Sequence, residues 1–237
     1  MQISTPCLKT LPIAGRTPNF IGLDMLAHEE HSSNPFDAAR AGSCEDILTF
    51  LFDDTQIDEP NNKGNTMLML AAWYGHAKAV EFLLAKGANP CHRNDDGACV
   101  LQFGSRNHDV LSLLLATEAV KDIDAQDYEG YSPLIQAANI YSAETLTPGH
   151  DMSVVVERIK CIETLLKHGA NVDVVTQQGR SALMIAASTN SVAFVQAILK
   201  GNPNKGLVCR KGQRAIDLTT NAAVKIALDT EYGVLKI

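Results

Sequence analysis

The chain has 237 residues, of which 46% are hydrophobic, enough for one domain with a sizeable core. The formal net charge is −7 with acids and bases interspersed, whereas nucleic-acid binders usually carry a basic patch. No apolar run approaches the ~20 residues that a membrane-spanning helix needs. The composition therefore predicts a protein that acts on neither nucleic acid nor membrane.

Residues 1–35 are predicted to form an N-terminal segment that packs on, or caps, the helices that follow. This stretch lacks the basic start and the continuous apolar core of a secretory signal. A targeting or partner-binding tail is the alternative interpretation. His28-Glu29-Glu30-His31 resembles the zinc-protease motif, but its histidines are three residues apart instead of four, so we expect no metal there.

Between residues 64 and 90 the sequence carries two short apolar stripes at helical spacing, separated by Gly75 and closed by Gly87. The stripes are Leu68, Ala71 and Ala72, followed by Val80, Leu83 and Leu84. This pattern predicts a helix, a tight turn, an antiparallel helix and a loop. Two such short helices cannot bury their apolar faces on each other alone, so the unit needs copies of itself on either side.

The glycine that opens this unit recurs at intervals of 33, 33, 49 and 33 residues, at Gly64, Gly97, Gly130, Gly179 and Gly212. The second-helix ending Leu-Leu-x-x-Gly-Ala-Asn at 83–89 is repeated at 165–171. On these residues the chain resembles the ankyrin repeat family, whose repeat is about 33 residues long. The resemblance covers roughly residues 36–228. It implies an all-α solenoid of stacked helix–turn–helix repeats with short hairpin loops.

We therefore expect an N-terminal segment (1–35), an ankyrin repeat domain of about six repeats (36–228) and a C-terminal tail (229–237). The repeats are placed at 36–60, 61–93, 94–126, 127–175, 176–208 and 209–228. The fourth has 16 extra residues (49 − 33) between its helices, around 141–153, and its second helix is expected to be about twice the normal length. Insertions in repeat arrays often serve binding, but a tolerated surface insertion explains this one equally well.

The sequence departs from the ankyrin pattern at a position that bears on stability. The family usually has a histidine after its Thr-Pro-Leu motif, and that histidine links adjacent loops by hydrogen bonds. Here the position holds Met69, Gln102, Ile135, Met184 and Asp217. We expect apolar packing to replace the polar network in three of these five repeats, and the array to be less stable than an idealised one.

The resemblance places the binding surface on the concave side, which is made of loop tips and first helices. Four of the six Trp and Tyr residues fall at its variable positions, and these residue types, with Arg, are enriched in interface hot spots. The predicted partner-binding residues are Trp73, Tyr74, Arg106, Tyr128 and Tyr131, ringed by Asp95, Asp96 and Glu129. The alternative is that Trp73 and Tyr74 pack against the neighbouring first helix and are mostly buried.

The function predicted from this resemblance is that of an adaptor or regulator which binds a partner protein on the concave face of repeats two to four. An effector that an intracellular bacterium or virus exports to act on a host protein is the alternative. A metal- or thiol-dependent enzyme is a more remote alternative, suggested by Cys91, His92, Cys99 and His108. Asp95 and Asp96 oppose a reactive thiolate there, so we expect no catalytic residue, metal or cofactor.

The six cysteines show no framework spacing, which is typical of free thiols in a reducing compartment. We therefore expect a cytoplasmic monomer, or a protein of the host cytosol if the chain is an effector.

Overall fold

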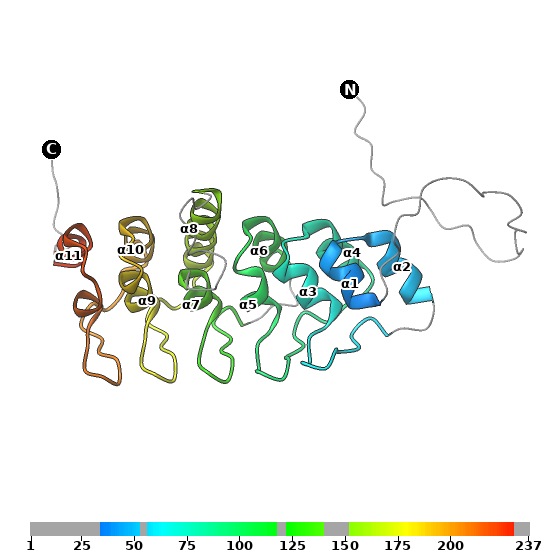
Figure 1. The fold of residues 1–237 in the computed structure, drawn as a ribbon, viewed down its shortest axis with the longest axis horizontal. Helices are drawn as coiled ribbons and strands as arrows, with labels where there is room; N and C mark the ends of the chain where they lie inside the picture. Colours follow the sequence, from blue (N-terminus) through cyan, green and yellow to red (C-terminus); the bar gives the residue numbers. More distant parts are fainter. Residues whose placement is uncertain (1–33, 53–55, 118–121, 140–151, 230–237) are drawn as a thin grey trace, which may run out of the picture.

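The computed structural model describes residues 34–52, 56–117, 122–139 and 152–229. Within these ranges the helices come in antiparallel pairs that stack in a single row, with the loops projecting from one side (Figure 1). The pairs are α1 (Pro35–Ala41) and α2 (Cys44–Phe52), α3 (Met67–Trp73) and α4 (Ala77–Ala85), α5 (Val100–Gly104) and α6 (His108–Leu115), α7 (Pro133–Ala138) and α8 (Met152–Lys167), α9 (Ala182–Ser188) and α10 (Val192–Leu199), and the 3-10 helix η1 (Ala215–Leu218) with α11 (Ala222–Asp229).

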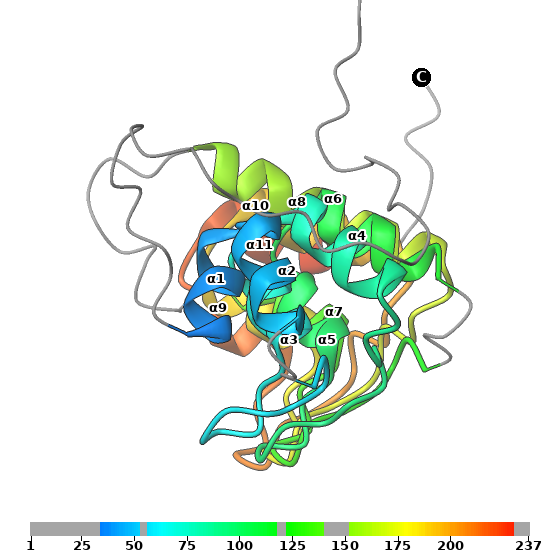
Figure 2. The same cartoon turned by 90° about the vertical axis from the view of Figure 1, so that its right-hand side faces the viewer.

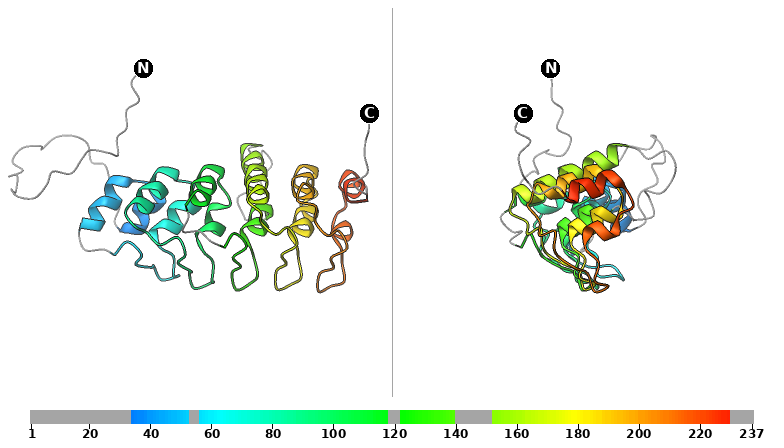
Figure 3. Two further views of the ribbon diagram at one scale, coloured as in Figure 1. Left: turned by 180° about the vertical axis from the view of Figure 1, so that it is seen from behind. Right: turned by 90° about the vertical axis from the view of Figure 1, so that its left-hand side faces the viewer.

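The pairs form two layers, because each first helix contacts the first helix of the next repeat and each second helix contacts the next second helix. Figure 3 shows the same row from behind and from its C-terminal end. The described residues contain one isolated bridge, between Val175 and Ser181, and otherwise no β structure. The predicted all-α solenoid of helix–turn–helix repeats is confirmed.

Three of the first helices, α3, α7 and α9, begin at a hydroxyl residue that occupies the same place in each of their repeats. Thr66, Ser132 and Ser181 each accept a hydrogen bond from the backbone N–H three residues later, which satisfies a donor that the helix leaves unpaired. The side chains that follow are almost all buried, and they join the buried side chains of the second helices in one continuous core. Local capping and shared burial together explain why helices of five to nine residues are stable in this array.

Backbone hydrogen bonds join each loop tip to the next. The amide of Asp95 donates to Lys63 O at 3.3 Å and that of Tyr128 to Asp96 O at 2.8 Å. The series continues from Gln177 to Glu129 O at 2.8 Å and from Arg210 to Gln178 O at 2.9 Å. Because these bonds use only main-chain atoms, they do not depend on the identity of the side chain at any position.

The expected apolar packing is confirmed at Met69, Ile135 and Met184, which are buried. The expectation that the loops lose their polar links is wrong, because other atoms make those links. Besides the backbone bonds between loop tips, the side-chain amide of Gln102 donates to Ala125 O at 2.8 Å, and His92 Nε2 lies 3.0 Å from Gly64 O. The polar links are therefore made by backbone atoms, by His92 in a loop and, in repeat three, by Gln102 at the histidine position itself.

Helix α8 is 16 residues long, against eight or nine for the other second helices, which confirms the expected doubling. Its Arg158 is only 2% exposed, and Nη1 donates to Gln136 O at 2.9 Å, in the last turn of α7. This bond brings a cation to the negative end of α7. Most of the predicted insertion, 141–151, lies outside the described residues, as do 1–33, with the His28–His31 motif, and 230–237.

The five described cysteines are thiols with very different surroundings. Cys91 is exposed on a loop, whereas Cys161 lies in the core between the helix layers, where burial raises the pKa of its thiol to about 12. Only the thiolate reacts with alkylating reagents. We expect Cys161 of the folded protein to be labelled at least about a hundredfold more slowly than Cys91 near pH 8, as followed by peptide mass spectrometry. Equal rates in the folded protein, with labelling in denaturant as the reference, would contradict the packing of α8.

Candidate partner-binding trough

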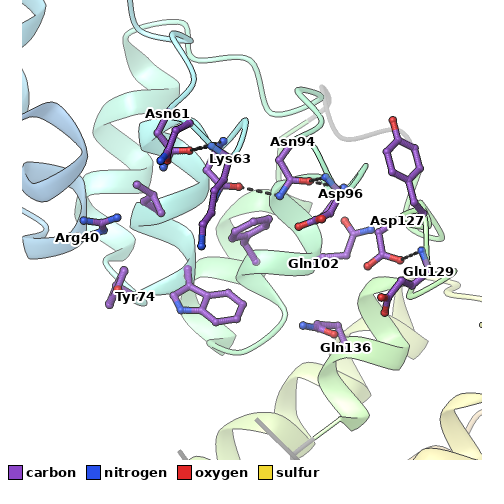
Figure 4. A pocket seen from close by; sticks show the side chains of 17 residues that line it. Arg40, Asn61, Lys63, Tyr74, Asn94, Asp96, Gln102, Asp127, Glu129 and Gln136 are labelled. Atoms are coloured by element: carbon purple, nitrogen blue, oxygen red, sulfur yellow. Dashed lines mark hydrogen bonds between the residues drawn. The ribbon is translucent and has the colours of Figure 1, made fainter. Parts of the chain in front are cut away.

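The loops bend to one side of the helix pairs, as the view along the stack shows (Figure 2). Where the loops of repeats two to four meet the first helices, they enclose an open hollow of about 580 Å3, which we call the trough (Figure 4). Its walls come from four consecutive repeats: Arg40 of α1, the loop tips at 61–65, 94–98 and 127–129, and the facing sides of α3, α5 and α7. The trough is therefore built by stacking and is absent from any single repeat.

Trp73, the last residue of α3, is the aromatic centre of the trough wall. Its ring and that of Phe103 of α5 make a T-shaped contact, with ring centroids 5.7 Å apart at 65°, and the Arg106 guanidinium lies 4.0 Å from the Trp73 centroid. Trp73 is thus half-buried: it packs on the neighbouring first helix, as one interpretation predicted, and it also lines the trough, as the other predicted. An aromatic ring held between a second ring and a cation is fixed in orientation before any partner arrives.

The tyrosines lie differently from one another. Tyr74 lines the trough, is 52% exposed and stacks on His76 at a centroid distance of 6.4 Å. Tyr128 lines the trough as well and is 68% exposed. Tyr131 is outside it and packs against the core, where burial, followed by the charge of Glu129, raises the pKa of its hydroxyl.

Charges of opposite sign occupy the two ends of the trough. Arg40 and Lys63 line the N-terminal end, and Asp96, Asp127 and Glu129 line the other (Figure 4). One oxygen of Asp127 accepts from the amides of Glu129 and Tyr131, at 3.0 and 2.8 Å, so this carboxylate also fixes its own loop. The resulting field favours a partner whose charges run in the opposite order.

Of the eight predicted residues, five line the trough: Trp73, Tyr74, Asp96, Tyr128 and Glu129. Arg106 does not line the trough but lies over the Trp73 ring, while Asp95 contributes its backbone amide to the bond with Lys63.

The sequence prediction omitted a column of trough residues from the first helices. Leu70, Phe103 and Gln136 lie four residues after the hydroxyl or thiol position that begins each of these helices, at a constant interval of 33. The omitted Arg40 stands 33 residues before Trp73, which in turn stands 33 before Arg106. The repeat register thus carries the signal for these residues, whereas the prediction rested on the placement of aromatic residues.

The residues that suggested an enzyme do not form one cluster. Cys99 is buried at the start of α5, where its Sγ donates to Gln102 Oε1 at 2.8 Å, and His92 is engaged with the carbonyl of Gly64. Across the described ranges no three His, Cys, Asp or Glu side chains are placed to hold a metal ion. None of the helices described there is both long and apolar enough to cross a membrane.

The fold and the trough together define a helical-repeat protein whose loops and first helices enclose an open hollow. Comparison with family models agrees: one for ankyrin repeats (3 copies) matches residues 35–94, and another for ankyrin repeats (many copies) matches residues 157–199. The chain belongs to the ankyrin repeat proteins, as the spacing of its glycines indicated.

Among curated proteins the chain is similar to neurogenic locus notch homolog protein 1 of Xenopus laevis, with 29% identity over 175 residues, which are 73% of this chain and 6% of the relative. It is also similar to NF-kappa-B inhibitor delta of Mus musculus, with 29% identity over 151 residues, 61% of this chain and 46% of that protein. The chain thus spans less than half the length of either relative.

Among solved structures the fold matches a chain in the complex of the Bdellovibrio bacteriovorus predatory endopeptidase Bd0816 with the immunity protein Bd3460. The TM-score is 0.59 at 24% identity, and the match covers 84% of this chain and 98% of the other. At this level of identity the likeness concerns the fold alone.

Proposed function

We propose that this chain is an adaptor or regulator that binds a segment of a partner protein in the trough of repeats two to four. The observation that carries the proposal is the placement of Trp73, a large ring held in a fixed orientation by Phe103 and Arg106 on the wall of an open hollow. Interfaces gain most of their affinity from such central, rigid aromatic residues.

The loop tips that line the trough are joined to each other by backbone hydrogen bonds, so little conformational entropy is lost when a partner binds. The charged ends add orientation, because a segment bound in reverse would place like charges together. Ankyrin repeats are protein-interaction modules, and NF-kappa-B inhibitor delta is by its name an inhibitor of another protein. We further propose that the role is binding without catalysis, in keeping with the structural use of Cys99 and His92.

Replacing Trp73 with Ala is expected to weaken partner binding by at least about 2 kcal/mol, or roughly thirtyfold in Kd. Cross-linking capture with the wild-type chain would identify the partner, and titration calorimetry would then compare wild type and Trp73→Ala. Val156→Ala is the matched control, since Val156 is 45% exposed on α8, in the other helix layer, and we expect it to bind as wild type. A folded Trp73→Ala variant with unchanged affinity would rule out the trough as the binding site.

A further inference from the structure

A second hollow, of about 340 Å3, lies between the loops of repeats five and six, and it is lined by Arg180, Arg210 and Lys211. We call it the basic pocket. Gln178, Cys209, Gln213 and Leu218 complete its lining, so among the described residues that form it three are cations and none is Asp or Glu. This concentration of positive charge stands out in a chain whose net charge is −7.

The basic pocket continues a charge gradient along the row of loop tips. The two residues before each opening glycine change from acidic to neutral to basic along the last four repeats: Asp95-Asp96, Tyr128-Glu129, Gln177-Gln178 and Arg210-Lys211. These pairs occupy equivalent positions, because each loop tip is bonded through its backbone to the next. The pocket is therefore the basic end of the same row that forms the trough.

Two features leave the basic pocket without an internal acid. Cys209 stands at the loop position that Asp127 occupies in repeat four, so a thiol replaces a carboxylate. The first acid after this loop, Asp217 of η1, accepts from the Arg214 amide at 2.9 Å and pairs with Arg214 Nε at 3.4 Å. Asp217 is thus engaged with Arg214, a basic residue that does not line the pocket.

The backbone that carries the cations is held in place. The Arg210 amide donates to Gln178 O of the preceding loop at 2.9 Å, and the Cys209 amide donates to Gln213 O across the base of its own loop at 2.9 Å. Arg180 is only half-exposed. Guanidinium groups on a fixed frame match carboxylates well, because each can make two parallel hydrogen bonds to one carboxylate.

We propose that the basic pocket binds an acidic, Asp- or Glu-bearing segment of a partner protein. A nucleic acid fits this surface less well, because its phosphates would continue over Glu129, Asp96 and Asp95 in the adjoining loops. The proposal extends the proposed function to a second place on the loop row, yet it needs no ligand in the trough, so the two are tested separately.

The test uses the full chain and fluorescein-labelled hexaglutamate, with fluorescence anisotropy as the readout. Arg210→Glu with Lys211→Glu is expected to weaken hexaglutamate binding at least about tenfold, and Arg210→Gln with Lys211→Gln at least about threefold. The control, Lys78→Glu with Lys225→Glu, changes the net charge equally at exposed positions of α4 and α11 and is expected to shift Kd less than about twofold. Circular dichroism checks that each variant is folded.

Three outcomes would overturn the proposal. One is equal loss of hexaglutamate binding in the Lys78/Lys225 control, which would indicate net charge alone. Another is tighter binding of a labelled single-stranded oligonucleotide than of hexaglutamate. The last is a loss in Trp73→Ala as large as that in the Arg210/Lys211 variant, which would place the peptide in the trough. Unchanged hexaglutamate binding by Trp73→Ala is the expected result, whatever that variant does to the partner of the trough.

Discussion

Replacing Phe194 with Ala should lower the free energy of unfolding by about 3–5 kcal/mol. Phe194 is fully buried on α10, which contacts α8, α9 and α11. The second helices of repeats two to four carry the smaller Ala79, Val110 and Cys161 at the same register. The space around Phe194 is therefore shaped for a large ring, and neighbours fixed in two helix layers can close only part of the cavity that Ala would leave.

Urea unfolding followed by circular dichroism would measure this loss. In a repeat array the weakened repeats five and six can unfold first, so an early separate transition is also expected. Ile226→Ala is the control: Ile226 is 64% exposed on α11, and its truncation should cost less than about 0.5 kcal/mol. A loss below about 1 kcal/mol for Phe194→Ala would show that α10 does not pack as described.

Gly130→Ala should destabilise the protein by about 2–5 kcal/mol, the sum of a backbone and a packing cost. Gly130 has φ of +85°, and a Cβ there would lie 2.8 Å from the Gln177 amide nitrogen and 2.9 Å from Thr176 Cα. Both contacts are with the backbone of the next loop, which the Gln177–Glu129 hydrogen bond holds close. The methyl group would push the two loops apart.

Gly169→Ala separates the two costs, because Gly169 has φ of +87° but nothing within 4 Å of its Cβ position. We expect this variant to lose only the conformational part, about 1–2 kcal/mol. Thermal unfolding gives the difference, and hydrogen exchange should show faster exchange of the Gln177 amide in Gly130→Ala alone. Equal destabilisation by both substitutions would mean that the loops are not in tight contact.

The helix pairs could be predicted from the sequence because their signals are local. Glycines at a 33-residue interval, a hydroxyl residue before three of the first helices and apolar stripes at helical spacing each belong to a single repeat and recur in others. The doubled length of α8 followed in the same way from the stripe that continues through Val155, Ile159 and Ile162.

The polar links between loops could not be predicted in this way. The expected loss of the network rested on the apolar side chains at one position of three repeats, but the structure joins the loops through backbone amides and through His92, which lies elsewhere in the repeat. Main-chain atoms carry no signature in a sequence. Whether two of them meet depends on how closely neighbouring repeats approach.

Only part of the trough could be predicted, because residue composition is only one of the features that determine which side chains line it. Trp73 and Tyr128 were found through the rarity of aromatic residues, while Arg40 and Gln136 are ordinary residues that line the hollow because of their place in the stack. Tyr131 shows the converse, since an aromatic residue beside the opening glycine turns towards the core.

Helix α8 gives the outer side of the stack an uneven profile. At 1.5 Å per residue its 16 residues extend about 24 Å, roughly twice the reach of α6 or α10, and it stands above both in Figure 1. A flat body laid along the second helices would meet this ridge and touch only one half of the row. The layer of second helices therefore presents a ridge and not a flat face, whereas the loops form an even row on the opposite side of the stack.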